Sequence, residues 1–409
     1  MDSAKFVICG GGMVAGYAAK QLVELGMKSG DLTILSADNA VPYERPPLSK
    51  GFLAGKETEE GIRINPEEFY RQHGIGIRLG GEVTAVDPNR KRVSLRDGGE
   101  IGFERLILAT GARVRTFDLP GARLRNIRYL RSLDDSKAIR ETASRVRHAA
   151  VIGGGFIGME VASVLAQANV EVTLILSEDR IWKRFFTPEM SQAFENYFEA
   201  RGVRFVKRAA VQAFRGKDAV ESVEFRDGSA VPCELVVAGI GVEPVTGYLA
   251  GSGIEVGDGV MVNEYLETNV PGILAAGDVA NYPDVLFGKR RRVEHWDNAV
   301  SQGQHCARNL MGERAPFRHV PYFFSDVFDL SYEFWGDPAD VDRVVHRGDL
   351  AGASFSVWWL RQSRVVAAFV MRRPDEEREA APRWIESGEH VSAAKLAEEH
   401  GPVEAAVER

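Results

Sequence analysis

The stretch Phe6–Ala15, with the sequence FVICGGGMVA, decides the fold of the first part of the chain. It begins with an apolar run typical of a strand. It continues at once into glycines that fit the pattern G-x-G-x-x-G/A through Gly10, Gly12 and Ala15. Residues 17–25 follow with the helical spacing of apolar side chains. The stretch therefore predicts a strand, a tight turn and a helix in direct succession.

Each part of this pattern suits the binding of a dinucleotide. Gly10 permits the tight turn, Gly12 lets the backbone approach a pyrophosphate, and Ala15 allows the helix to pack closely on the strand. The helix N-terminus offers free N–H groups and the positive end of its dipole to phosphates. Asp38, which follows a predicted strand at 32–35, can accept hydrogen bonds from a ribose diol. This context favours a dinucleotide site over a plain structural turn.

The same pattern occurs a second time in residues 149–178. Gly153, Gly155 and Gly158 complete the motif between a predicted strand and a predicted helix, and Glu178 takes the place of the acid. Two such patterns predict two dinucleotides, of which the usual pair is a flavin and a nicotinamide. The alternative is a structural repeat without a second ligand.

Composition and charge restrict the class of protein. Hydrophobic residues make up 44% and charged residues 27% of the 409 positions, which is typical of a globular protein with two or three domains. The net charge of -7 argues against a nucleic-acid partner. No apolar run reaches the length of a membrane span, and the N-terminus lacks a signal-peptide pattern. We expect a cytoplasmic protein without a membrane span.

The cysteines exclude one kind of flavoprotein. Cys9, Cys233 and Cys306 are far apart in the sequence, and no Cys-x-x-Cys pair occurs. This spacing excludes a redox-active dithiol and a cysteine zinc site. We therefore predict no metal site, and each cysteine is expected to be a small buried residue.

Other candidate cofactor contacts lie in loops. Residues 41–51 form a proline-stiffened loop on which Arg45 and Lys50 present positive charge. This suits a cofactor contact, although a surface loop with incidental cations is the alternative. Thr110 ends a buried strand and Gly241 lies in a stiff turn, and we count both among the candidates.

A further acid lies near the end of another predicted strand. Asp278 follows the apolar residues 272–276, a place that suits a carboxylate beside a ligand. Residues 279–281 are expected to begin a helix whose N-terminus can face phosphate.

The order of these elements predicts an α/β protein in which one nucleotide-binding domain is inserted into another. The insert is expected at residues 116–240, between the two parts of the other domain.

Several motifs taken together resemble the ferredoxin-reductase-like FAD/NAD(P)H oxidoreductases. This group includes oxygenase-coupled NADH–ferredoxin reductases, apoptosis-inducing factor and monodehydroascorbate reductases. The resemblance covers nearly the whole chain and implies two Rossmann-like domains and a C-terminal α/β interface domain. It assigns FAD to residues 1–115 and 241–315, the nicotinamide cofactor to the inserted residues 116–240, and the interface domain to residues 316–409. Glu178 itself favours NADH over NADPH, because an acid at this place can accept from ribose hydroxyls and repels a 2′-phosphate. The motifs that carry it are Gly10–Ala15, Tyr43–Lys50, Ala109–Ala112, Val151–Glu160, Gly272–Val279 and Val293–Ala299.

The resemblance also implies roles for individual residues. Arg45 and Lys50 would contact the flavin, and Lys50 would pair with Glu160, so that a positioned cation stabilises negative charge on the reduced flavin. Asp278 would bind the ribityl chain of FAD. Trp296 matches an aromatic residue stacked near the flavin, for which ordinary core packing is the alternative. Lys50, Glu160 and Trp296 are thus the candidate catalytic residues.

The electron acceptor is less directly implied. Monodehydroascorbate reductases are associated with an arginine and a tyrosine at the places of Val300 and Phe324, which lack the polar groups to hold an ascorbyl radical. This difference favours a small iron–sulfur protein such as a ferredoxin. A monodehydroascorbate- or quinone-type reductase and a redox-controlled binding protein like apoptosis-inducing factor stay open, as does a monomer or a homodimer.

One basic run bears on such a partner. Lys289, Arg290, Arg291 and Arg292 precede Trp296, and cations near the flavin could steer an acidic ferredoxin. The alternatives are a solvated loop or a contact with FAD phosphate.

Overall fold

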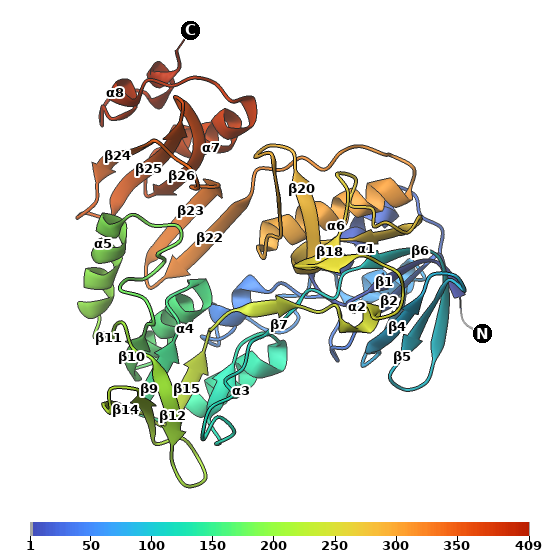
Figure 1. Ribbon diagram of the computed structural model, residues 1–409, viewed down its shortest axis with the longest axis horizontal. Coiled ribbons are helices and arrows are strands. Elements are labelled where there is room, and N and C mark those ends of the chain that lie inside the picture. The colour runs from blue at the N-terminus through green and yellow to red at the C-terminus, as the bar shows by residue number, and fades with distance from the viewer. Residues whose placement is uncertain (1–2, 409) are drawn as a thin grey trace. The chain divides into compact units, whose positions relative to one another are not determined.

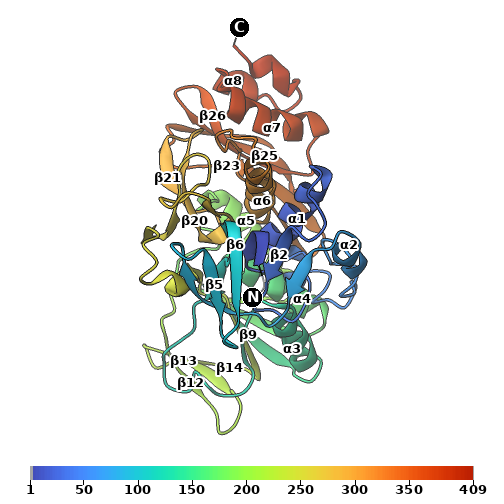
Figure 2. The same cartoon turned by 90° about the vertical axis from the view of Figure 1, so that its right-hand side faces the viewer.

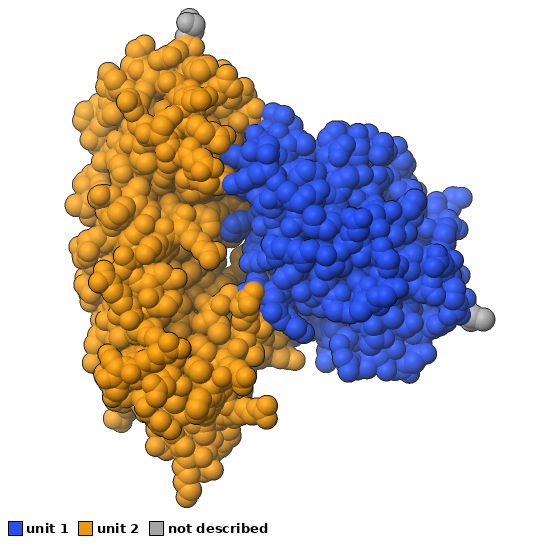
Figure 3. Space-filling view, in the orientation of Figure 1, with its two compact units in different colours: residues 1–45, 58–113, 242–321 blue, residues 46–57, 114–241, 322–409 orange. Residues whose placement is uncertain are grey.

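The computed structural model describes residues 3–408, and within them the chain forms two compact units (Figure 3). Unit 1 comprises residues 1–45, 58–113 and 242–321. Unit 2 comprises residues 46–57, 114–241 and 322–409. The boundary at Arg45 and Pro46 falls within the proline-rich loop, so that this loop contributes to both units.

Unit 1 is built on a parallel sheet in the order β3-β2-β1-β6, with β19 also parallel to β6 and with β5 and β4 continuing the sheet antiparallel (Figure 1). Cys9 aligns with Leu35 on one side and with Leu108 on the other. The carboxyl ends of these strands therefore lie at one edge, where ligands bind in such sheets. The strands are β1 (Ser3–Cys9), β2 (Leu32–Leu35), β3 (Gly76–Arg78), β4 (Val83–Asp87), β5 (Arg92–Leu95), β6 (Glu100–Leu108) and β19 (Ile273–Ala275).

Two helices of unit 1 lie side by side, as Figures 1 and 2 show: α1 (Met13–Glu24) and α6 (Trp296–Leu310). A Cβ atom at Gly303 would lie 2.8 Å from the carbonyl oxygen of Val14, so a glycine permits this close approach. The remaining elements of the unit are α2 (Glu67–Gln72), β16 (Val242–Pro244), η2 (Gly247–Leu249), β17 (Val256–Gly257), β18 (Gly259–Met261), η3 (Gly277–Val279), β20 (Ala280–Asp284) and β21 (Lys289–Arg291).

The helix expected to begin at residues 279–281 is not formed, and this prediction was wrong. The single 3-10 turn η3 leads directly into β20, which pairs in parallel with β18 through Val260 and Ala280. Pro283 would have fallen inside such a helix, where it has no N–H to donate and its ring clashes with the preceding turn.

Unit 2 contains a second parallel sheet, in the order β11-β10-β9-β15-β8, and a small antiparallel sheet of β12, β13 and β14. Ser132 and Asp135 form a capping box that begins α3 at Leu133. The elements are β8 (Ile127–Tyr129), α3 (Leu133–Ala143), β9 (His148–Ile152), α4 (Phe156–Gln167), β10 (Glu171–Ile175), α5 (Pro188–Glu199), β11 (Arg204–Val206), β12 (Val211–Arg215), β13 (Ser222–Phe225), β14 (Ala230–Pro232) and β15 (Leu235–Ala238). The sequence boundary of the unit, at Val114, falls within β7 (Ala112–Val114).

Unit 2 also contains a C-terminal antiparallel sheet in the order β22-β23-β26-β25-β24. Its buried carboxylate Glu377 accepts hydrogen bonds from Arg347 at 2.8 Å and from Ser356 at 2.5 Å, and so joins helix to sheet. The C-terminal elements are β22 (Tyr322–Val327), β23 (Leu330–Gly336), β24 (Arg343–Asp349), β25 (Ser354–Arg361), β26 (Arg364–Met371), α7 (Asp375–Ser387), α8 (Ala393–Leu396) and η4 (Val403–Ala406). The 3-10 turn η1 (Pro46–Ser49), from the early part of the chain, also belongs to unit 2.

Within residues 3–408, none of the helices combines the length and the apolar character that a membrane crossing requires.

Candidate active site

The first glycine turn leaves open space at the N-terminus of α1. Gly10 has φ +124°, and a Cβ atom there would lie 2.0 Å from the Ala109 carbonyl oxygen, so the position requires glycine. Gly12 is the N-cap residue of α1, and no described side chain caps the helix there. A Cβ atom at Gly12 would have as its nearest described neighbour Nη2 of Arg45, at 3.9 Å. An exposed helix end beside a guanidinium fits the pyrophosphate of a dinucleotide.

Asp38 and Arg45 are both held by the same tyrosine of unit 1. The Tyr43 hydroxyl donates to Oδ2 of Asp38 at 2.7 Å, and the backbone N–H of Asn39 donates to Oδ1 at 2.8 Å. The guanidinium of Arg45 lies over the Tyr43 ring, 4.8 Å from its centroid. The acid and the cation predicted for the cofactor thus sit near the carboxyl edge of the parallel sheet.

Two further candidates stand at strand ends of the same sheet. The Thr110 hydroxyl donates to the Val245 carbonyl at 2.8 Å, so its side chain anchors the backbone beyond β6. Asp278 lies half-buried in η3, just after β19. Arg292 donates to the Asp278 carbonyl at 2.9 Å and thereby fixes this turn, a role that sequence reasoning missed.

Trp296 is held through its indole N–H. This group donates to Oε2 of Glu44 at 2.5 Å, while the Tyr17 hydroxyl donates to Oε1 of the same carboxylate at 2.6 Å. Burial, together with the hydrogen bond and the charge of Glu44, raises the pKa of Tyr17, so the phenol stays protonated. Glu44 thus fixes the orientation of the indole, and sequence reasoning identified neither Glu44 nor Tyr17 as part of the site.

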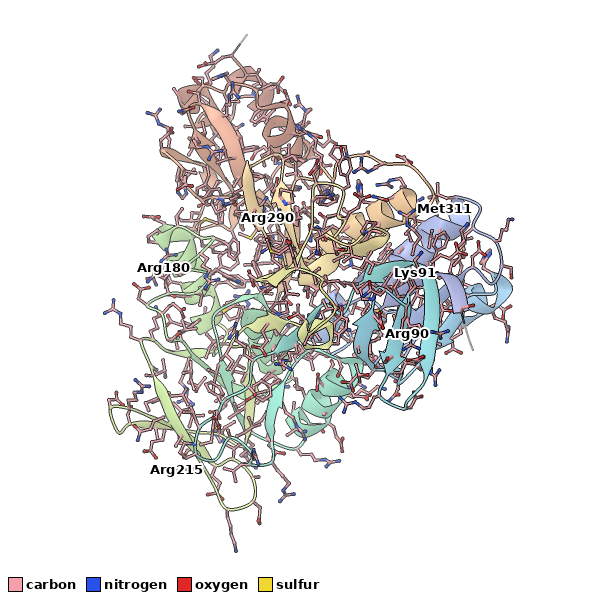
Figure 4. The ribbon with its side chains drawn as sticks, turned by 45° about the vertical axis from the view of Figure 1, so that its right-hand side comes forward. Arg90, Lys91, Arg180, Arg215, Arg290 and Met311 are labelled. Atoms are coloured by element: carbon pink, nitrogen blue, oxygen red, sulfur yellow. The ribbon has the colours of Figure 1, made fainter. Side chains whose placement is uncertain are left out.

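The basic run before Trp296 is engaged by groups of unit 1. Arg290, which is labelled in Figure 4, donates to the carbonyls of Val262 at 2.9 Å and Asn281 at 2.7 Å. Arg291 pairs with Asp284 and lies over the Phe287 ring.

Arg292 also contacts carboxylates, namely Asp258 at 3.1 Å and Glu294 at 2.5 Å. Carboxylates therefore balance the charges of Arg291 and Arg292, and these two arginines hold the fold of their own unit. Lys289 and Arg290 are exposed, and the steering of an acidic partner by these two cations stays a prediction.

The second glycine turn, in unit 2, repeats the first. Gly153 has φ +117°, and a Cβ atom there would lie 2.3 Å from the Gly239 carbonyl oxygen. A Cβ atom at Gly158 would lie 2.0 Å from the Gly153 carbonyl oxygen, so α4 packs directly on the turn. Gly155 is the N-cap residue of α4, and a Cβ atom there would meet no described atom within 4 Å. This open helix end fits a second pyrophosphate.

Glu178 follows β10 at the carboxyl edge of the second sheet and accepts a hydrogen bond from Ser177 at 2.7 Å. Arg180, labelled in Figure 4, donates to the Phe186 carbonyl at 2.7 Å and to Ser191 at 3.0 Å. Lys183 pairs with Asp179 at 3.0 Å. Arg180 and Lys183 are therefore engaged within their own segment. A third cation, the exposed Arg208, donates its backbone N–H to the Glu178 carbonyl at 2.9 Å.

Gly241 completes the set of predicted glycines. It has φ +99°, and its carbonyl accepts the backbone N–H of Arg115 at 2.9 Å. The turn after β15 thus requires glycine for its backbone conformation.

The structure brings Lys50 and Glu160 together inside unit 2. Nζ of Lys50 lies 2.7 Å from Oε1 of the buried Glu160. Ser49 donates to Oε2 of Glu160 at 2.5 Å, and Ser325 donates to Oε1 at 2.6 Å. Nζ of Lys50 also lies 5.3 Å from the centroid of the Phe324 ring. Glu160 therefore joins η1, α4 and β22 through one carboxylate.

The third candidate catalytic residue, Trp296, belongs to unit 1 with the first glycine turn. The two serines around Glu160 were not predicted. Ser49 stands next to Lys50 in the sequence, which was the available signal, whereas no pattern in the sequence connects residue 325 with residue 160.

The cysteines take no part in these sites. Cys9, Cys233 and Cys306 are free and buried in the described part of the chain. Burial, with a contribution from Glu234, raises the pKa of Cys233 to about 12, so this thiol is not a nucleophile at neutral pH.

The family model for the pyridine nucleotide-disulphide oxidoreductases matches residues 4–303, and a model described as reductase C-terminal matches residues 322–407. The chain belongs to the pyridine nucleotide-disulphide oxidoreductase family. Within it, the chain is an FAD-dependent NAD(P)H oxidoreductase of the ferredoxin-reductase type, and the predictions of fold class, enzyme class and cofactors are confirmed.

Similar proteins fall into two groups. Monodehydroascorbate reductase 4 of Arabidopsis thaliana, a peroxisomal protein, is 37% identical over 395 residues, which cover 91% of this chain and 80% of the relative. The ferredoxin reductase subunit of 5,5'-dehydrodivanillate O-demethylase from Sphingobium sp. is 34% identical over 97% of both chains.

Solved structures of reductases have the same fold. Putidaredoxin reductase, in a covalent complex with putidaredoxin, gives a TM-score of 0.94 at 32% identity over 99% of both chains. A ferredoxin reductase from Rhodopseudomonas palustris gives 0.94 at 30% identity over the full length of both chains.

Proposed function

We propose that the enzyme takes hydride from NADH and passes electrons singly to a small iron–sulfur protein. The observation that carries this proposal is the pairing of the half-buried Lys50 with the buried Glu160, which lies near the start of α4, the helix that begins at the second glycine turn. A lysine fixed at this place can stabilise negative charge that arrives with hydride from a nicotinamide. The similarity to reductases of ferredoxin and putidaredoxin supports the acceptor class.

Bound FAD supplies the chemistry, since a flavin accepts hydride and releases electrons one at a time. The residues of the chain bind and orient the cofactors. Gly12 and Arg45 would receive the FAD pyrophosphate, and Gly155 that of NADH. The other proposed contacts are Gly10, Ala15, Asp38, Thr110, Asp278 and Trp296 for FAD, Gly153, Gly158, Glu178 and Gly241 for NADH, and Lys50 with Glu160 beside the flavin.

The proposed function goes with a division of the chain into three domains, whose bounds are those expected from the sequence. We assign residues 1–115 and 241–315 to FAD, residues 116–240 to NADH and residues 316–409 to an interface domain, and we place the enzyme in the cytoplasm. Expression of the separate segment 116–240 tests the assignment, because an independent NAD domain should fold and bind NADH without FAD.

The acceptor can be tested with the holoenzyme in parallel assays driven by NADH. An acidic [2Fe–2S] ferredoxin should be reduced in steady state, and its rate should fall with ionic strength if charges guide the encounter. Ascorbyl radical should be reduced at least about 10-fold more slowly, because the protein offers it no polar side chain at Val300 or Phe324. A tenfold ratio of rates corresponds to about 1.4 kcal/mol. Fast reduction of ascorbyl radical with no reduction of the ferredoxin would contradict the proposal.

Reduction of monodehydroascorbate is the second candidate, and the identity to plant enzymes of that name favours it. The side chains at the two expected substrate positions argue against it. Val300 packs against the apolar core of unit 1, and the Phe324 ring faces the Lys50 ammonium. Neither side chain offers a hydrogen bond to an ascorbyl radical.

NADH should be preferred over NADPH because of Glu178. Its carboxylate can accept from ribose hydroxyls and repels a 2′-phosphate, while Arg180 and Lys183 are engaged elsewhere. We expect kcat/KM to be roughly 10-fold or more higher with NADH, and Glu178→Gln to reduce this ratio. The control Glu171→Gln removes the same charge at the opposite end of β10 and should leave the ratio unchanged. A wild-type preference for NADPH would show that Glu178 has another role.

A further inference from the structure

Glu160 holds Lys50 with the help of two hydroxyl groups. We propose that Ser49 and Ser325 are positioning residues that fix the Glu160 carboxylate and thereby set the positive charge that Lys50 presents to the flavin. The proposal rests on the function proposed above for the Lys50–Glu160 pair, and it adds two residues and the C-terminal domain to the determinants of the flavin potential.

The first support is the saturation of the carboxylate. Oε1 of Glu160 accepts from Lys50 at 2.7 Å and from Ser325 at 2.6 Å, while Oε2 accepts from Ser49 at 2.5 Å. Hydrogen bonds from hydroxyl groups to a charged acceptor are short and strong. These contacts account for both carboxylate oxygens and divide the negative charge of Glu160 among three donors.

The second support is burial. The exposed fractions are 3% for Glu160, 1% for Ser49 and 0% for Ser325. Water from the bulk cannot replace a missing hydroxyl at such a place without a rearrangement. Loss of either serine therefore leaves a buried carboxylate oxygen with fewer donors, which is unfavourable in the interior of a protein.

The third support is the origin of the donors. Ser49 lies in η1, Glu160 in α4, and Ser325 in β22 of the C-terminal sheet. Phe324, the neighbour of Ser325, places its ring beside the Lys50 ammonium. One strand of the C-terminal domain thus contacts both members of the pair, which gives this domain a part in the chemistry of the site.

The chemistry predicts a direction. Ser325 and Lys50 share one carboxylate oxygen, so removal of the hydroxyl leaves the negative charge of Oε1 to Lys50 alone. The tighter pair offsets more of the lysine charge, and the reduced flavin loses stabilisation. Ser49 likewise draws negative charge toward Oε2, and its removal leaves more of the delocalised charge to face Lys50. Without either hydroxyl, the midpoint potential of the flavin should therefore become more negative.

The test compares Ser49→Ala, Ser325→Ala and the double variant as FAD-loaded proteins. Spectroelectrochemical titration should show a more negative midpoint potential in each, with the largest shift in the double variant. Flavin reduction by NADH should slow by about 3-fold to 10-fold, as expected for one hydrogen bond. Ser325→Thr keeps the hydroxyl and should restore the wild-type potential.

Ser356→Ala is the matched control. Ser356 donates to the buried Glu377 at 2.5 Å in the same unit, and this hydrogen bond involves neither Lys50 nor Glu160. The variant should therefore lose a similar amount of stability and keep the wild-type flavin potential. An equal potential shift in Ser356→Ala would overturn the proposal, because the effect would then be one of general stability.

Lys50→Met separates this proposal from the function on which it rests. If Lys50→Met shifts the potential and both serine variants do not, the positioning role is overturned and the proposed function stands. If Lys50→Met also leaves the potential unchanged, the role of the ion pair itself is overturned. A potential shift in the serine variants with rescue by Ser325→Thr supports the proposal.

Discussion

Gly12→Asp should give a folded protein that purifies without FAD and is colourless. The residue caps α1 with extended backbone angles, φ −92° and ψ −155°, which aspartate adopts readily and which suit a helix cap. Its carboxylate would enter the space beside Arg45 and repel the phosphates at the helix end. We expect FAD affinity to fall at least about 100-fold, which corresponds to about 2.8 kcal/mol.

Circular dichroism and thermal unfolding of Gly12→Asp decide whether FAD affinity is lost because the phosphate site is blocked or because the protein is misfolded. An unchanged spectrum and cooperative unfolding, with no flavin released by acid, are the expected results. A yellow Gly12→Asp protein with normal FAD affinity would show that the first glycine turn does not receive the cofactor.

Gly155→Asp should give the opposite result, namely a yellow protein that NADH no longer reduces. Gly155 caps α4 with similar angles, φ −86° and ψ −174°, and a Cβ atom there meets no atom of the described chain within 4 Å. The same added carboxylate therefore blocks the other pyrophosphate site. We expect kcat/KM for NADH to fall at least about 100-fold.

The two aspartate variants control for one another because each adds the same side chain at the same position of an equivalent helix. Dithionite should still reduce the flavin of Gly155→Asp, since this reductant needs no binding site. Normal reduction of Gly155→Asp by NADH would contradict the assignment of the second turn to the nicotinamide cofactor.

The two glycine turns could be predicted because their determinants are local. Gly10 and Gly153 need positive φ angles, and Gly158 needs the absence of a Cβ atom, so the residue types reveal the backbone. The spacing to Asp38 and Glu178 is set by the length of a helix and a strand. Such short-range rules made the two parallel sheets readable from the sequence.

Contacts between distant segments could not be read in this way. The carboxylate partners of Arg291 and Arg292 could not be read from the sequence, because Asp284 and Asp258 come beside these arginines only through the pairing of β18, β20 and β21. Ala280 and Asn281 lie in a strand instead of a helix because their backbone pairs with β18. Propensity gives way to long-range pairing in such places.

The surroundings of the candidate catalytic residues show the same limit. The pairing of Lys50 with Glu160 was expected only from a family resemblance, and the hydroxyl of Ser325 reaches the pair from 165 positions away. Glu44 lies beside Arg45 in a recognised motif, yet its bond to the Trp296 indole links residues 252 positions apart. Such partners follow from the folded chain and not from any spacing.

The central claim is that one chain binds both FAD and NADH, and that electrons pass from NADH to FAD and then to a separate carrier protein. Anaerobic addition of one equivalent of NADH to the FAD-loaded wild-type protein tests it most directly. The flavin absorbance should bleach, and an oxidised [2Fe–2S] ferredoxin added afterwards should restore it as two ferredoxin molecules are reduced per flavin. A flavin that stays oxidised in excess NADH would contradict the account.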